Sequence, residues 1–342
     1  MSLLPYIERI MSHEGLSAEE AESAMHVILS GQASVPQLAA FLTGLRMKGE
    51  TVDELAGFAR AMRAKAAPVD VGLDGVALLD TCGTGGDRSD TFNISTVAAF
   101  VVAGAGVHVA KHGNRSISSK CGSADLLEGL GIRLEVTPEQ SARAIREVGI
   151  GFLFAPVVHA AMKHAHPVRT DLKMRTAFNL LGPLTNPAGA NAQLAGAPSE
   201  RAAELIAGAL AALGLRHGFV VHGSDGLDEI TTTGETLAFE IREGQIDRRT
   251  LEPGDFGVAV AKATDLKGGD RERNLEIARA VLCGGHGPQR DVVLANAAAA
   301  LVAAGRASVF LEGAAIAAVS IDTGAAKAKV EALERFTQGF RD

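Results

Sequence analysis

From Val76 onward the sequence repeats one pattern: a short apolar run, a glycine-rich turn, and an alanine-rich stretch with helical periodicity. This pattern is typical of a sheet whose strands are connected by helices. Ligands of such sheets bind beyond the carboxyl ends of the strands. Functional residues are therefore expected in the loops after Asp80, Ala110, Phe154 and His222. Strands are expected at 76–80, 107–110, 133–136, 151–154, 194–196, 219–222 and 237–241, and helices at 200–213 and 291–304.

The first 66 or so residues carry no strand pattern and instead predict a series of short helices. Glycines that could end these helices occur at positions 15, 31 and 49. Pro68 marks the end of the helical segment. The segment is therefore expected to form a helical domain or arm beside the sheet. Helix-capping boxes are predicted for Ser17 with Glu20, Ser34 with Gln37, and Thr51 with Glu54.

Composition narrows the class of protein further. The 342 residues carry a net charge of −7, which gives no general attraction to nucleic acid or anionic membranes. The three cysteines are too few for a disulfide framework and fit a reducing compartment. The first residues lack the pattern of a signal peptide, and the most apolar stretch, 97–110, is too short to span a bilayer. A cytoplasmic location is expected.

The first segment that suggests chemistry covers residues 80–87, with glycines at 83, 85 and 86. Asn93, Ser95 and Thr96 follow it at the start of an apolar helix. Glycines let main-chain N–H groups approach an anion, and a helix N-terminus adds donors along its dipole. The segment has neither the Walker A ending nor the dinucleotide glycine spacing. Alone, it is consistent with a phosphate cradle or with an ordinary turn between strand and helix.

The second segment covers residues 111–125 and also follows an expected strand. Two lysines, an arginine and four serines occur over 111–123, a concentration of anion-binding side chains in an acidic protein. A solvated basic loop is the alternative. Because two such loops follow neighbouring strands, a ligand with more than one phosphate is favoured.

The third segment, residues 222–229, ends in the adjacent acids Asp228 and Glu229. Mg²⁺ binds one or two carboxylates and shares its remaining positions with substrate phosphates, so the pair is a candidate magnesium site. An exposed acidic turn is the alternative.

The fourth segment contains His159, His164 and His166, whose spacing matches no zinc signature. Arg169 follows, and its guanidinium could hold a carboxylate through two parallel hydrogen bonds. The alternatives are a surface arginine and an arginine paired with a nearby acid such as Asp171.

Together these segments resemble the family of anthranilate phosphoribosyltransferases over nearly the full length. The motifs that carry the resemblance occur in the family's order at 83–87, 93–96, 111–115, 122–125, 154–156, 167–169, 175–176, 179–187 and 225–229. It implies an α/β protein with a small N-terminal helical domain and a larger α/β domain with a central mixed, mainly parallel sheet, as in nucleoside phosphorylases. The helical domain would cover 1–70, joined by helices near 165–185, and the α/β domain 71–342. One departure is Val157-Val158, where many members have a polar residue.

The resemblance also implies an activity: transfer of the 5-phosphoribosyl group from phosphoribosyl pyrophosphate to the amine of anthranilate, in tryptophan biosynthesis. It implies a homodimer formed through the helical domain and two Mg²⁺ ions per subunit. No catalytic residue is expected beyond the binding residues, because an aromatic amine needs no strong general base and catalysis should be mainly positioning and charge stabilisation. Phosphoribosyl pyrophosphate would be held by Gly83, Gly86, Asp87, Thr91, Asn93, Ile94, Ser95, Thr96, Lys111, His112, Gly113, Asn114, Arg115, Ser119 and Ser123. Anthranilate would contact Gly83, Asn114 and Arg169, and magnesium would be held by Ser95, Asp228 and Glu229.

Two other functions remain open from the sequence. A pyrimidine nucleoside phosphorylase would share the fold and the glycine loop, but Arg169, the 179–187 segment and the acid pair favour the anthranilate enzymes. A nucleic-acid-binding relative without catalysis would need a positive face, and the net charge of −7 disfavours it.

Overall fold

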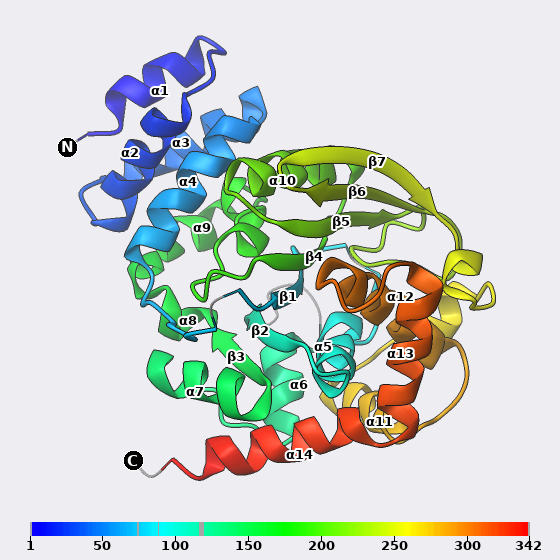
Figure 1. Ribbon diagram of the computed structural model, residues 1–342. Coiled ribbons are helices and arrows are strands. Elements are labelled where there is room, and N and C mark those ends of the chain that lie inside the picture. Colours follow the sequence, from blue (N-terminus) through cyan, green and yellow to red (C-terminus); the bar gives the residue numbers. More distant parts are fainter. Residues whose placement is uncertain (1, 74, 88, 116–119, 341–342) are drawn as a thin grey trace.

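A seven-stranded sheet organises the computed structural model, which describes residues 2–73, 75–87, 89–115 and 120–340 (Figure 1). The strand order is β3-β2-β1-β4-β5-β6-β7. The first five strands of this order run parallel, and β6 and β7 continue the sheet in antiparallel pairs. The expected mixed, mainly parallel sheet is thereby confirmed. The strands are β1 (Leu78–Gly83), β2 (His108–Gly113), β3 (Ile150–Phe154), β4 (Ala192–Gly196), β5 (His217–Gly223), β6 (Thr236–Arg242) and β7 (Gln245–Leu251).

One expected strand is absent, and one observed strand was not expected. Residues 133–136 form no strand; Leu134 and Val136 are buried in the core, and the Arg133 N–H donates to the Thr337 side chain rather than to a neighbouring strand. The sequence pattern missed β7, because six of its seven residues are exposed and it lacks an apolar run. A tight turn with positive φ at Glu243 and Gly244 joins it to β6.

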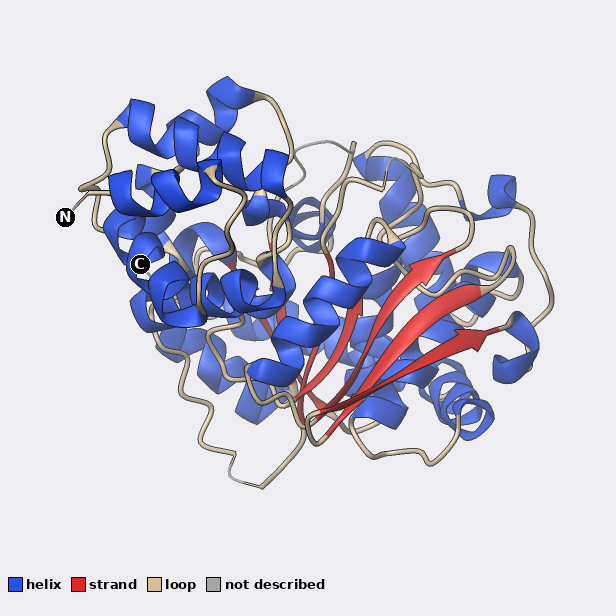
Figure 2. Ribbon diagram, turned by 90° about the horizontal axis from the view of Figure 1, so that it is seen from above, coloured by secondary structure: helices blue, strands red, loops and turns tan. Residues whose placement is uncertain are grey.

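Helices cover both faces of the sheet (Figure 2). The alternation along β5 shows the two sides: Phe219 and Val221 belong to one apolar core, and Val220 between them belongs to another. The first core is formed with α5 (Ile94–Gly104) and α12 (Pro288–Ala303), and the second with α10 (Glu200–Ala212). The expected helices at 200–213 and 291–304 are confirmed within a few residues at their ends.

The N-terminal segment folds into four helices: α1 (Leu4–Met11), α2 (Ala18–Leu29), α3 (Val35–Lys48) and α4 (Val52–Lys65). The capping boxes at Ser17 and Thr51 are confirmed. Ser34 caps α3, but the Gln37 side chain accepts from the Leu3 N–H instead of completing a box. The apolar core of these helices also takes in Val168, Phe178 and α10, so it continues into the second core of the sheet.

The remaining helices complete the layers around the sheet. Among the described residues, no helix is both long enough and apolar enough to span a bilayer. The α-helices are α6 (Ser123–Gly129), α7 (Pro138–Val148), α8 (Ala155–Val158), α9 (His166–Leu172), α11 (Arg271–Leu282), α13 (Phe310–Asp322) and α14 (Ala325–Gln338). Short 3-10 turns are η1 (Ala160–His164), η2 (Ala177–Asn179), η3 (Gly182–Leu184), η4 (Pro253–Phe256) and η5 (Ala263–Leu266).

The direction of strand connection reverses between β1 and β4, and ligands of parallel sheets bind beside such a reversal. The carboxyl ends of these two strands are in register, Gly83 opposite Gly196. Asp228 packs directly over both glycines, since a Cβ at either position would overlap its atoms. The fold thus brings the acidic loop after β5 onto the glycine loop after β1.

Candidate active site

The acid pair Asp228 and Glu229 is buried, with 8% of each residue exposed. Asp228 Oδ2 accepts a hydrogen bond of 2.7 Å from the Gly85 N–H. Glu229 Oε1 accepts one of 3.1 Å from the Ser95 N–H at the start of α5. The alternative of an exposed acidic turn is therefore wrong.

Burial raises the pKa of both acids. The pKa of Asp228 lies well above its usual value because of desolvation and the nearby carboxylates of Asp87 and Glu229. Desolvation raises the pKa of Glu229 to about 7, although Lys111 and Ser95 oppose the shift. Such shifts mark buried negative charge that lacks a sufficient cation partner.

This chemistry fits a magnesium ion. The pair offers hard oxygen ligands. It is not part of a group of three or more His, Cys, Asp or Glu side chains that could hold a metal in the described part of the chain, so a metal bound here would need further ligands from elsewhere. Mg²⁺ commonly takes one or two carboxylates and completes its shell with water and phosphate oxygens. Asp228, Glu229 and the neighbouring Ser95 are the residues that would hold it.

The glycine loop after β1 is fixed from two sides. Asp228 binds the Gly85 N–H from one side. From the other, Arg175 donates to the carbonyls of Gly86 at 2.9 Å and Gly85 at 3.1 Å. Because the C=O and N–H of a peptide unit point in opposite directions, these bonds direct the next N–H groups away from Arg175. Gly85 and Gly86 have φ of 69° and 79°, values that favour glycine.

The start of α5 lies beside this loop. Asn93 is its N-cap residue but makes no side-chain capping bond; its amide donates to the Cys121 carbonyl, and its Oδ1 is buried without a partner in the described residues. The side chains of Ile94 and Thr96 are buried, so Ile94 can meet a ligand only through its main chain. Thr91 forms an isolated bridge with Lys267 just before the helix.

Lys111 and His112 lie inside β2 rather than in a loop. The Lys111 ammonium is buried and donates to the Thr81 carbonyl. The His112 N–H donates to Asp80 on β1. Burial lowers the pKa of His112 to about 4 and that of its ring neighbour His159 to about 3, so both imidazoles are neutral at physiological pH. The Nε2 atoms of both rings lack a partner within the described residues.

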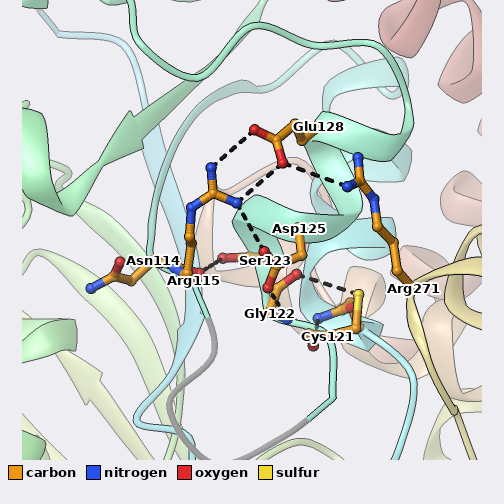
Figure 3. Close-up of polar contacts among 9 residues, drawn as sticks. Asn114, Arg115, Cys121, Gly122, Ser123, Asp125, Glu128 and Arg271 are labelled. Atoms are coloured by element: carbon orange, nitrogen blue, oxygen red, sulfur yellow. Dashed lines mark hydrogen bonds and ion pairs between the residues drawn. The ribbon is translucent and has the colours of Figure 1, made fainter.

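The loop after β2 contains Asn114 and Arg115 and returns to Ser123 at the start of α6 (Figure 3). Gly113 approaches Ser123 so closely that a Cβ would overlap its hydroxyl. Ser119 lies outside the described residues. Arg115 is ion-paired with Asp125 and Glu128 and therefore adds no unpaired positive charge to the loop.

Arg169 lies on α9, half-buried, with its guanidinium 4.9 Å from the centre of the Phe178 ring. Burial lowers its pKa. No ion pair joins it to Asp171 or to another carboxylate in the described part of the chain. The Arg169 guanidinium is thus packed against an aromatic ring, and its charge can pair with a carboxylate of a ligand.

Sequence reasoning gave no individual role to Asp80, Arg175 or Asn186. Asp80 is fully buried and accepts from the Asn186 amide at 2.8 Å, and the same amide donates to the Ala110 carbonyl. Asn186 therefore fastens the 182–186 segment to β1 and β2, as Arg175 fastens its own segment to the glycine loop. The partners are some 76 to 106 residues apart, so no local signal could reveal them.

Both parts of the chain match models of one enzyme class. Residues 4–66 match "Glycosyl transferase family, helical bundle domain", and residues 75–327 match "Glycosyl transferase family, a/b domain". The fold and the buried acid pair beneath a glycine loop thus define a glycosyltransferase.

Similarity to individual proteins is more specific. The chain is 72% identical over 336 residues to the anthranilate phosphoribosyltransferase of Solibacter usitatus, covering 98% of this chain and 99% of that protein. The Saccharomyces cerevisiae enzyme in complex with PRPP and Mg is 30% identical with a TM-score of 0.91, covering 99% of this chain and 98% of that one. The same yeast enzyme in complex with 4-fluoroanthranilate gives 28% identity and a TM-score of 0.88 over the same shares. The chain belongs to the anthranilate phosphoribosyltransferase family.

Proposed function

We propose that phosphoribosyl pyrophosphate binds across the loops after β1 and β2 and the start of α5, with anthranilate between those loops and α9. The donor contacts would come from residues 83–87, 91–96, 111–114, Ser119 and Ser123, and from Arg115 only through its main chain, because its guanidinium is ion-paired with Asp125 and Glu128. Gly83, Asn114 and Arg169 would contact the acceptor. The observation that carries this assignment is the Asp228 carboxylate, which is buried, bonded to the glycine loop and without a cation partner among the residues that the structure describes.

The chain transfers the 5-phosphoribosyl group of phosphoribosyl pyrophosphate to the amine of anthranilate, giving N-(5-phosphoribosyl)anthranilate and pyrophosphate. The bond from the anomeric carbon to pyrophosphate breaks, the bond to nitrogen forms, and the amine loses a proton. An aromatic amine is already unprotonated at neutral pH, so the neutral His112 and His159 need not act as strong bases. The glycine-loop N–H groups bind and orient the leaving group, and Arg169 orients the acceptor.

Magnesium is bound in the yeast enzyme, and we propose two ions per subunit here. When bound, Mg²⁺ neutralises the charge that develops on departing pyrophosphate. Asp228 and Glu229 would supply its protein ligands, together with Ser95.

The direct test is the loss of anthranilate fluorescence on mixing the chain with anthranilate, phosphoribosyl pyrophosphate and Mg²⁺. The chain contains no tryptophan and one tyrosine, so its own fluorescence interferes little. We expect a decay that requires all three additions. If a nucleoside is cleaved by inorganic phosphate while anthranilate fluorescence persists, the nucleoside phosphorylase assignment is correct instead.

We propose a homodimer formed through the helical domain. Large apolar side chains on α1 and α3 are exposed, among them Met11 at 74% and Met47 at 78%. Met11→Glu with Met47→Glu should weaken the dimer at least tenfold, since each buried methionine contributes about 1.5–3 kcal/mol. Light scattering after size-exclusion chromatography measures the mass. Val319→Glu, equally apolar and 60% exposed on α13, is the control and should remain dimeric; a monomeric wild type contradicts the proposal.

We also propose that the chain works in the cytoplasm. Cys82 and Cys283 are free thiols in the described part of the structure. Free thiols persist in a reducing compartment, which supports this location.

A further inference from the structure

Arg115 is bound to α6 by two carboxylates (Figure 3). Its Nη2 donates to Glu128 Oε1 at 2.9 Å, and its Nη1 donates to Glu128 Oε2 at 3.1 Å, a bidentate pair. Nη1 also donates to Asp125 Oδ1 at 3.0 Å. Glu128 is held in turn by Arg271 of α11 at 3.7 Å. The four side chains therefore form a charge-balanced network.

The network fixes the main chain that follows β2. The Asn114 carbonyl accepts from the Ser123 hydroxyl at 3.1 Å and from the Ala124 N–H at 3.3 Å. Arg115 adds its ion pairs one residue later and lies 5.8 Å from the centre of the Phe154 ring at the end of β3. In Figure 3 the Asn114 side chain points away from the carboxylates. The ion pairs thus attach the main chain to α6, and the Asn114 side chain extends from the side of the main chain that faces away from α6.

We propose that Arg115 is a positioning residue, and that Glu128 and Asp125 act with it to hold Asn114 where donor and acceptor meet. This inference rests on the proposed function. According to this proposal, Glu128 favours the binding of phosphoribosyl pyrophosphate, although Glu128 and this ligand are both negatively charged. The alternative is that Arg115 leaves its carboxylates and binds a phosphate directly.

Glu128→Gln separates the two roles because they predict opposite signs. If Arg115 positions the loop, loss of the bidentate partner loosens Asn114 and raises the KM for phosphoribosyl pyrophosphate. If Arg115 is a phosphate ligand, removal of a competing carboxylate frees the guanidinium and lowers that KM. Arg115→Gln raises the KM in both cases and does not discriminate.

We expect Glu128→Gln to raise the KM for phosphoribosyl pyrophosphate roughly three- to tenfold, the range for losing charge-assisted hydrogen bonds that are partly exposed. The kcat should change less than twofold, since the substitution leaves the glycine loop, the acid pair and Arg169 in place. Arg115→Lys should fall between wild type and Arg115→Gln, because lysine keeps the charge but loses the fork. Arg115→Gln with Glu128→Gln should be no worse than Arg115→Gln alone, since both remove one interaction.

The charge-exchanged variant, Arg115→Glu with Glu128→Arg, gives a second readout. It should recover part of the KM lost in Arg115→Glu alone, because the ion pair can form in reverse. Glu204→Gln is the matched control, because Glu204 forms an exposed ion pair with Arg201 on α10. The KM of this variant for phosphoribosyl pyrophosphate should equal that of wild type. Melting temperatures confirm that each variant is folded.

The outcomes are distinct. A wild-type protein that does not consume anthranilate refutes the proposed function itself. An active wild type whose Glu128→Gln variant has an unchanged or lower KM for phosphoribosyl pyrophosphate refutes the positioning role. So does a charge-exchanged variant as impaired as Arg115→Glu.

Discussion

Neutralising the buried acids, by Asp228→Asn with Glu229→Gln, should lower kcat/KM by about three orders of magnitude while leaving the protein folded. Both side chains are buried and have raised pKa values, so the folded protein bears the cost of two carboxylates without a full cation partner. Isosteric amides remove that cost. They also remove the charge that would hold magnesium.

Initial rates over a range of Mg²⁺ concentrations, together with melting temperatures by circular dichroism, measure both effects. The variant should need much more Mg²⁺ and regain part of its activity when it is supplied. Glu235→Gln, an exposed acid on the same loop, is the control and should behave as wild type. An unchanged Mg²⁺ dependence in the double variant would falsify the metal role.

The same acids give the metal-free protein a pH-dependent stability. Their pKa values are raised on folding, so the stability they contribute is present at low pH, below the unfolded pKa, and is lost as the pH rises through about 7, the pKa of Glu229. The wild type without Mg²⁺ should therefore melt progressively below the double variant between pH 5 and pH 8. Added Mg²⁺ should reduce this difference at pH 8. A difference independent of pH would contradict the raised pKa values.

Features set by neighbouring residues could be predicted from the sequence. Thr51 and Glu54 cap a helix because their three-residue spacing alone places the two groups together. The strands of the parallel sheet were expected within a few residues, because buried strands are short apolar runs. The acid pair was found because a loop after a parallel strand lies at the ligand-binding edge.

Features set by long-range contacts could not. Lys111 belongs by sequence to a basic loop, but it is buried in β2, where its ammonium donates to the Thr81 carbonyl of the neighbouring strand and feels the charge of Asp80. Arg115 lies in a basic segment and is expected from the sequence to bind phosphate. Its guanidinium is instead hydrogen-bonded to Asp125 and Glu128 of α6. β7 lies at the sheet edge with most of its side chains in solvent, so burial imposes no apolar pattern on it.

Arg169→Ala should raise the KM for anthranilate about ten- to a hundredfold and leave the KM for phosphoribosyl pyrophosphate within about twofold. Anthranilate presents a carboxylate beside its amine, and a guanidinium fork can hold the carboxylate while the amine faces the anomeric carbon. The loss of a hydrogen bond to a charged group costs about 1.5–3 kcal/mol, and each 1.4 kcal/mol is about tenfold. Because Arg169 packs on Phe178 and has no carboxylate partner among the described residues, its fork is oriented before substrate binds.

Benzoate, the acceptor without its amine, isolates the carboxylate contact. Its inhibition constant against anthranilate should rise in Arg169→Ala by the same factor as the KM for anthranilate, and Arg169→Lys should fall between because it keeps the charge without the fork. Arg201→Ala, an exposed arginine on α10, is the matched control and should change neither constant. If Arg169 only supports the fold through Phe178, Arg169→Ala will lower the melting temperature with both constants unchanged. A stably folded Arg169→Ala variant with wild-type affinity for anthranilate and benzoate would therefore exclude the carboxylate contact.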